Sequence, residues 1–71
     1  MAQEVLAALA GNVWKVSVAV GDTVEEDDEL FVVEALKMEI PVYSPCDGKV
    51  AEIRVTKGDA VEEDDVMAVI D

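Results

Sequence analysis

The sequence predicts an all-β protein in which two small antiparallel sheets face each other as a flattened barrel or sandwich. Three observations support this prediction: the chain is written twice, apolar and polar residues alternate along each copy, and Gly-Asp pairs mark turns at matching places. Helix signals are weak, because the segment with the most helix-forming residues has a β-branched middle.

The duplication spans Gly11–Val33 and Gly48–Ile70, which align without a gap at an offset of 37 residues. Eleven of the 23 aligned positions are identical, including the Gly-Asp pair and a Glu-Glu-Asp-Asp run in each copy. Repeat solenoids need about three or more units. Two copies therefore predict a single domain over residues 1–71 with internal two-fold symmetry, in which each copy contributes strands to both sheets.

Alternation at period two predicts half-buried strands early in each copy. The residues in phase are Trp14, Val16, Val18 and Val20 in the first copy and Ala51, Ile53 and Val55 in the second. On this pattern Trp14 is expected to fill the core. The continuous apolar runs at 30–33 and 66–70 predict strands buried on both faces. The acidic runs at 25–28 and 62–65 are expected to be solvated turns.

Lys37 stands between the two copies, at the turn expected between a strand near 30–36 and one near 38–43. The positions equivalent to it by the repeat offset fall just outside the two ends of the chain. The symmetry therefore predicts that the termini lie together at one end of the barrel, with Lys37 at the opposite end. An exposed lysine amine stays protonated in water, so it suits acylation by another enzyme better than acid–base catalysis.

The composition argues against several functions. Seventeen acidic residues against five basic ones give a net charge of −12, which disfavours nucleic acids and anionic membranes as partners. Histidine is absent, so neither an autonomous hydrolase nor a metal site is expected. Cys46 is the single cysteine and is expected to be a packed, reduced residue near a turn. No apolar run reaches the roughly 18 residues that span a bilayer, and the first residues lack the features of a secretory signal, so we expect a cytoplasmic protein.

The segment VVEALKMEIPVYSPCDGKV, at 32–50, closely resembles the attachment segment of biotinyl domains, whose signature is Glu-Ala-Met-Lys-Met. Further motifs of the biotinyl/lipoyl superfamily, among them VGDTV and KGDAV, follow in order over essentially the whole chain. The resemblance implies a flattened barrel of eight strands in two four-stranded sheets. The residues that it implies for the site are Lys37 as the covalent attachment point of biotin, Leu36 and Met38 as flanking recognition residues, and Glu34 and Ala35 as the rest of the motif.

By the same resemblance, biotin protein ligase modifies Lys37, and the protein is a non-catalytic biotin carboxyl carrier. Its biotin accepts carboxylate at a biotin carboxylase site, and the carrier moves carboxybiotin to a carboxyltransferase or decarboxylase site. The length suits a small stand-alone carrier, similar to the short biotin/lipoyl attachment proteins, or a carrier domain of a larger enzyme.

Three features depart from the family pattern. Leu36 stands where methionine is usual, which preserves apolar bulk but removes one of the residues that distinguish biotin acceptors from lipoyl acceptors. Asp27 and Asp64 stand where turn glycines are common, and aspartate tolerates the left-handed conformation better than most residues. The protruding thumb loop of some bacterial carriers is absent, since the first copy is no longer than the second.

Two alternatives stay open. A lipoyl carrier domain presents a similar lysine, usually with an acidic residue before it and alanine after it, and Leu36 and Met38 do not match that pattern. Modification of Lys37 by both groups also stays open. The other alternative is an unmodified sandwich module for protein–protein contact, although such modules usually carry a long insertion between halves that abut in this chain.

Overall fold

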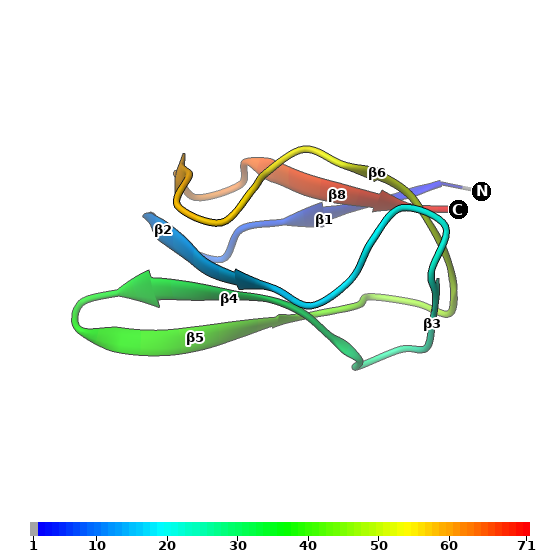
Figure 1. The fold of residues 1–71 in the computed structure, drawn as a ribbon, viewed down its shortest axis with the longest axis horizontal. Coiled ribbons are helices and arrows are strands. Elements are labelled where there is room, and N and C mark those ends of the chain that lie inside the picture. Colours follow the sequence, from blue (N-terminus) through cyan, green and yellow to red (C-terminus); the bar gives the residue numbers. More distant parts are fainter. Residues whose placement is uncertain (1) are drawn as a thin grey trace.

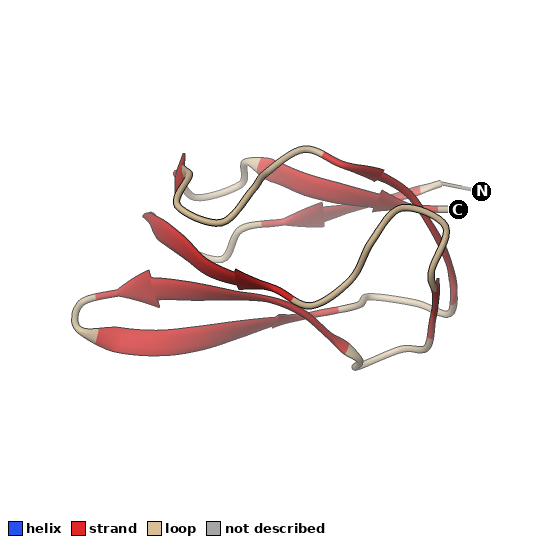
Figure 2. Cartoon of the chain, viewed as in Figure 1, coloured by secondary structure: helices blue, strands red, loops and turns tan. Residues whose placement is uncertain are grey.

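A computed structural model describes residues 2–71, which form two four-stranded antiparallel sheets (Figure 1). The strands are β1 (Gln3–Leu6), β2 (Gly11–Val16), β3 (Thr23–Val24), β4 (Glu29–Ala35), β5 (Met38–Tyr43), β6 (Gly48–Ile53), β7 (Ala60–Val61) and β8 (Val66–Ile70). Figure 2 shows only strands and loops over the described residues. The predicted all-β sandwich of eight strands is confirmed. Within residues 2–71 no helix has the length and apolarity needed to cross a membrane.

The two sheets follow the sequence duplication. One has the strand order β1-β8-β6-β3 and the other the order β5-β4-β2-β7, so each strand corresponds to one in the facing sheet. Because β3 joins β6 and β7 joins β2, each copy supplies strands to both sheets, as predicted. The Gly21 amide donates to the Val50 carbonyl at 2.8 Å, and the Gly58 amide donates to the Val13 carbonyl at 2.7 Å. The copies are therefore interlocked, and neither forms a separate unit.

The β4–β5 hairpin lies at the opposite end of the molecule from the start of β1 and the end of β8 (Figure 1). Gln3 pairs with Ile70, which places the two ends of the described chain side by side. The molecule measures 33 × 17 × 17 Å, and the hairpin and the chain ends mark its long axis. The arrangement predicted from the internal symmetry is confirmed.

A β-bulge in β2 decides which residues of that strand reach the core. Val13 pairs with Val33 and Lys15 pairs with Val32, so Trp14 is an extra residue between two paired positions. Val13 is buried, whereas Trp14 is 50% exposed. The prediction that Trp14 fills the core is wrong, because one extra residue reverses the phase of an alternating pattern. The second copy has the same bulge at Ala51, which is exposed.

Bulges also explain the continuous apolar runs in β4 and β8. Leu30 and Met67 are the extra residues of two further bulges, at equivalent positions of the two copies. Leu30 and its neighbour Phe31 are both fully buried as a result. Val32 and Val69 are only half-buried. These strands therefore bury one face together with the bulged residue, and the prediction of burial on both faces holds only in part.

The acidic runs form exposed turns, as predicted, and their carboxylates serve their own backbone. In each run the last aspartate accepts a hydrogen bond from the amide of the first glutamate, at 2.9 Å and 2.8 Å. Asp27 and Asp64 have φ angles of 73° and 70°, so the left-handed conformation expected at these positions is confirmed. Over residues 2–71 no group of three or more potential ligands is arranged to hold a metal ion. The hydrogen bonds that Asp28 and Asp65 accept give these turns a structural role.

The loop after β5 holds Cys46 as a free, half-buried residue packed against the core. The buried Ser44 hydroxyl donates a hydrogen bond to the Cys46 carbonyl at 2.6 Å. The expectation of a packed cysteine near a turn is confirmed.

Candidate functional site

The candidate site is the turn that joins β4 to β5. Ala35 and Met38 form the last cross-strand pair, so only Leu36 and Lys37 close the hairpin. Their φ angles are 52° and 63°, and positive φ at both central residues is what a type I′ hairpin turn requires. Asparagine and glycine usually fill such turns, because the left-handed conformation costs other residues roughly 1–2 kcal/mol each. The turn therefore displays two large side chains at a cost in backbone energy.

This backbone conformation was not predicted, although the tight turn was. Neither leucine nor lysine favours positive φ, so the residue types at positions 36 and 37 argue against a left-handed turn. The usable signal was the short spacing between the strands expected near 30–36 and 38–43, which leaves room only for a tight turn.

Exposure changes abruptly at the base of the turn. Ala35 is 6% exposed, whereas Leu36 is 87% and Met38 is 64% exposed. Lys37 between them is also exposed. Arg54–Glu52 is the one ion pair within residues 2–71, so no described carboxylate lies within 4.0 Å of the Lys37 amine. An enzyme that approaches the turn therefore meets an accessible amine with an exposed apolar side chain on each side.

Neighbouring strands fix the base of the hairpin. β4 is paired with β5 on one side and with β2 on the other. Gly11 of β2 approaches β4 so closely that a Cβ atom there would lie 2.5 Å from the Glu34 carbonyl oxygen. Sequence reasoning missed this role of Gly11, because it arises only from the contact of two strands. β5 is an edge strand, and Pro41 within it lacks the amide that a further strand would pair with.

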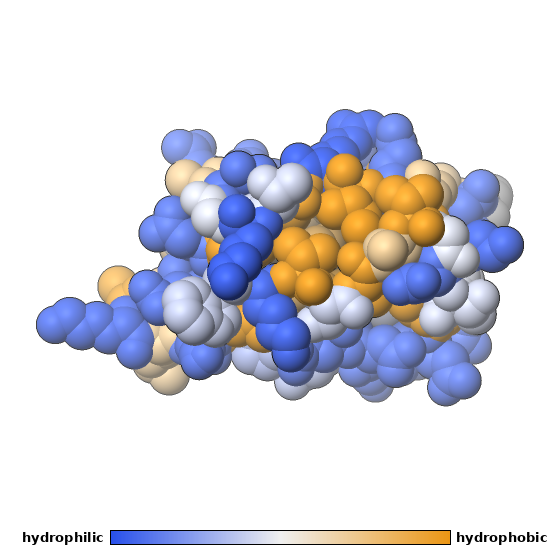
Figure 3. Space-filling model, in the orientation of Figure 1, coloured by the Kyte–Doolittle hydropathy of each residue, from blue (hydrophilic) through white to orange (hydrophobic). Residues whose placement is uncertain are grey.

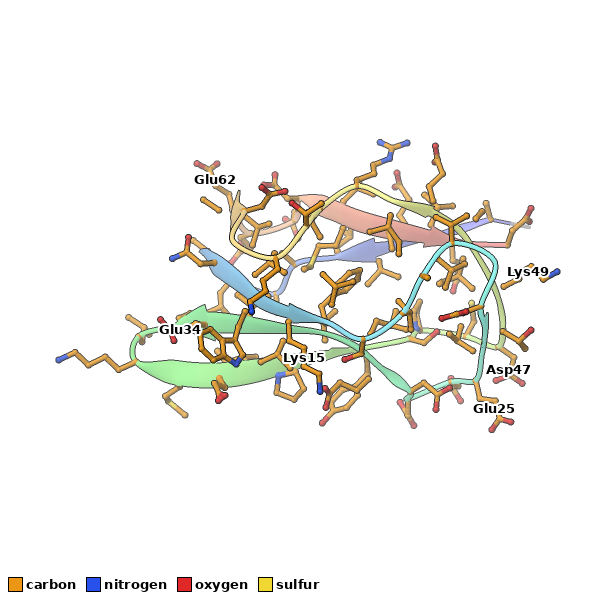
Figure 4. All side chains as sticks on the ribbon, viewed as in Figure 1. Lys15, Glu25, Glu34, Asp47, Lys49 and Glu62 are labelled. Atoms are coloured by element: carbon orange, nitrogen blue, oxygen red, sulfur yellow. The ribbon has the colours of Figure 1, made fainter. Side chains whose placement is uncertain are left out.

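A pair of carboxylates lies next to the turn. Glu34 and Glu39 are directly opposite each other, one pair below Ala35 and Met38. Both are exposed, and Figure 4 labels Glu34 near the turn end of β4. Like charges that face each other across two strands are destabilising. Lys37 is the single basic residue between residues 29 and 43. The hairpin therefore carries one amine at its turn and two carboxylates, those of Glu34 and Glu39, next to the turn.

The structure brings all the predicted site residues together in this hairpin. Glu34 and Ala35 end β4, Leu36 and Lys37 form the turn, and Met38 begins β5. The chain contains no histidine that could accept a proton from the amine. The arrangement presents an accessible amine that can be acylated.

Comparisons with known proteins agree on the kind of domain. Residues 3–70 match the biotin/lipoyl family described as "Biotin-requiring enzyme". Over 40 residues the chain is 45% identical to the biotin/lipoyl attachment protein of Bacillus subtilis (strain 168). This alignment covers 56% of this chain and 55% of that protein. Over 42 residues it is 43% identical to the pyruvate carboxylase of Staphylococcus aureus (strain Mu50 / ATCC 700699). This alignment covers 59% of this chain and 4% of that enzyme.

Two solved structures contain a closely similar fold. The crystal structure of Kluyveromyces lactis urea carboxylase matches 99% of this chain with a TM-score of 0.93 and 40% identity, over 6% of its own length. A single-chain, multi-domain long-chain acyl-CoA carboxylase matches 96% of this chain with a TM-score of 0.90 and 29% identity, over 7% of its length. The matches thus span about half of the attachment protein and a small part of each carboxylase.

Proposed function

Because the chain belongs to the biotin/lipoyl attachment family, we propose that it is a biotin carboxyl carrier in which Lys37 is the biotinylated residue. The observation that carries the proposal is the placement of Lys37 in a two-residue turn at the end of the molecule remote from both chain ends. In such a carrier the cofactor supplies the reactive group and the protein supplies its position.

The chemistry asked of Lys37 is formation of one amide bond. Its Nζ atom, once deprotonated by the modifying enzyme, attacks the activated carboxyl carbon of biotin. The C–N bond forms as the bond from that carbon to the activating group breaks, and the activating group leaves with the electron pair. Acylation removes the positive charge and lengthens the side chain into an arm. We propose biotin protein ligase as this enzyme, with the exposed side chains of Leu36 and Met38 as the contacts by which it recognises the turn.

The placement of the turn suits transfer between two active sites. Bound biotin supplies an acceptor for a carboxyl group, and this chain holds the arm on a turn whose base is fixed by β2, β4 and β5. The chain ends lie at the other end of the molecule, so a connection made there would not crowd Lys37. Tethering keeps the carried group at high effective concentration near its second site. The proposed partners are a biotin carboxylase and a carboxyltransferase or decarboxylase.

Two observations favour biotin over a lipoyl group. Met38 follows the lysine, at the position where lipoyl domains usually have alanine. The similar solved structures named above are carboxylases, as is one of the two named relatives. The name of the Bacillus subtilis relative covers both groups, so lipoylation is a defined outcome of the test below.

Intact mass spectrometry tests the proposal. The protein is expressed with biotin protein ligase and, separately, with a lipoyl ligase, and modified peptides are then mapped. We expect one biotinyl group on Lys37 with the first enzyme and no addition with the second. A lipoyl addition without a biotinyl addition would show that the protein is a lipoyl carrier. An unchanged mass with both enzymes would refute the carrier function and favour the unmodified interaction module.

A further inference from the structure

An apolar groove lies on one face of the molecule, between the β2–β3 and β6–β7 connections. Its volume is about 500 Å³, and we call it the dyad groove. Its larger apolar lining residues are Trp14, Val16, Val18, Val20, Ile53 and Val55, with Lys15 and Lys57 beside them. Figure 3 shows a contiguous apolar area on this face. Val16 and Val18 are the repeat equivalents of Ile53 and Val55, so the groove lies on the internal two-fold axis.

The groove exposes more apolar surface than the fold requires. Val20 is 63% exposed and Trp14 is 50% exposed, whereas other valines, such as Val13 and Val50, are buried in the core. The bulge that turns Trp14 outward therefore adds it to the groove wall. In small monomeric proteins, contiguous exposed apolar patches mark surfaces that contact a partner.

The charges at the groove are the reverse of those on the rest of the chain. The protein has five basic residues against seventeen acidic ones, yet Lys15 and Lys57 both line this groove. Neither has a carboxylate within 4.0 Å in the described part of the chain. The Lys57 ammonium lies 5.8 Å from the centre of the Trp14 ring, within the range of a cation–π contact. The groove thus combines apolar walls with two cations that have no acidic partner.

We propose that the dyad groove docks an acidic segment of a partner protein, with apolar side chains of that segment in the groove and its carboxylates on Lys15 and Lys57. The assignment of this partner as a component of a biotin-dependent carboxylase rests on the proposed function. At short range, charge complementarity of this kind selects partners. In an overall acidic protein it also directs an acidic partner to this one face.

Charge and exposure argue against two other occupants. A second copy of the chain would bring another net charge of −12 to the contact, and a two-fold contact at the groove would bring its own Lys15 and Lys57 near their equivalents. A small ligand would be left largely open to water beside Val20, which is 63% exposed, whereas small-molecule sites bury about 70–90% of the ligand surface. A protein segment covers the groove without either difficulty.

The groove is separate from the modified turn. Its lining comes from residues 14–20 and 53–57, and it includes no residue of β4, β5 or the turn between them. Because Leu36, Lys37 and Met38 do not line the groove, docking of a segment there is compatible with chemistry at Lys37. The groove would hold the carrier on its partner while the arm enters the active site.

Amide NMR with two synthetic peptides tests the groove without any modification of Lys37. The probes are a peptide of alternating glutamate and leucine and a matched peptide with lysine in place of glutamate, both at physiological salt. We expect the acidic peptide to shift the amides of Val18, Val20 and Val55, and the Val20→Asp variant to lose these shifts. The basic peptide should instead shift the acidic turns. Absence of groove shifts with the acidic peptide would overturn the proposal.

Steady-state kinetics with a purified biotin carboxylase component tests the identity of the partner. With the biotinylated protein as substrate, we expect Lys15→Glu and Lys57→Glu each to raise KM roughly tenfold with little change in kcat. The matched control is Lys49→Glu, a substitution that changes the charge by the same amount. Lys49 lies at the end of the molecule where the chain termini meet, away from the groove (Figure 4). It should leave KM within about twofold.

These outcomes separate the two proposals. A protein that carries biotin but has the same KM in all three lysine variants overturns the docking of this carboxylase component alone. Absence of biotin on the unaltered protein overturns the carrier function, and the peptide shifts then decide the docking surface by themselves. Thermal unfolding of each variant shows whether the fold is kept, as expected for side chains at exposed positions.

Discussion

Ala35 pairs directly with Met38 across β4 and β5, and this pairing leaves only Leu36 and Lys37 to close the hairpin. Ala35 is the last buried residue of β4, and its partner Met38 is mostly exposed. The pair therefore marks the boundary between the core and a turn that projects beyond it.

Replacement of Lys37 should abolish biotinylation and leave the fold intact. Lys37→Ala removes the amine, and Lys37→Arg keeps the charge but offers no group that the ligase acylates. Because Lys37 is exposed and makes no ion pair with the described residues, its loss should change the free energy of unfolding by less than about 0.5 kcal/mol. Mass spectrometry and urea unfolding measure the two effects. Label that persists on Lys37→Ala, or is lost from the control Lys49→Arg, would contradict the site assignment.

Replacement of Leu36 by asparagine should stabilise the protein and slow its modification. Asparagine tolerates positive φ better than leucine, so we expect a gain of roughly 0.5–1 kcal/mol in the free energy of unfolding. The ligase rate should fall because the exposed apolar side chain is lost. The control Leu36→Val should destabilise the turn, since a β-branched residue disfavours this conformation. Equal stability of the two variants would show that the turn is unstrained in solution.

Replacement of Met38 by alanine should slow biotinylation without unfolding the domain. Met38 is 64% exposed, so its truncation removes little buried surface, and we expect a change in stability within about 0.5 kcal/mol. Ligase kinetics at several protein concentrations measure the effect on recognition. A ligase rate equal to that of the unaltered protein would mean that Met38 plays no part in recognition.

Replacement of Gly11 by alanine should destabilise the protein and disturb the turn. The new Cβ atom would lie 2.5 Å from the Glu34 carbonyl oxygen, so β2 and β4 have to separate, at a cost of about 1–3 kcal/mol. The matched control is Gly48→Ala, whose Cβ would lie 2.8 Å from the Asp71 carbonyl oxygen at the other end of the molecule. Both variants should lose stability in urea, but only Gly11→Ala should also slow the ligase. Equal ligase rates in the two variants would contradict the role of Gly11 in positioning the turn.

Much of the fold was predictable because a repeat carries long-range information. The offset between the copies placed the termini together and Lys37 opposite them, and the Gly-Asp and acidic turns lie where the pattern set them. The candidate site residues came from the resemblance of one segment to an attachment motif, and Glu34 to Met38 fall in a single hairpin because they are consecutive. Consecutive residues need no tertiary contact to be brought together.

Local patterns failed where an extra residue changes the phase of a strand. Alternation placed Trp14 inside the barrel, but the pairing of Val13 with Val33 leaves Trp14 as a bulge on the surface. A bulge forms when packing against a partner strand favours it, and that partner lies about twenty residues away in the chain.

The sequence alone determined that the chain is a twofold-repeated β sandwich with a single lysine projected from the end opposite its termini. Only the tertiary structure decided the left-handed turn at Leu36 and Lys37, the close approach of Gly11 to Glu34, and the dyad groove. The approach of Gly11 and the groove depend on segments that are distant in the chain and adjacent in space, and the turn conformation depends on the register in which β4 pairs with β5. Periodicity and spacing describe one strand at a time, so they do not predict contacts between strands.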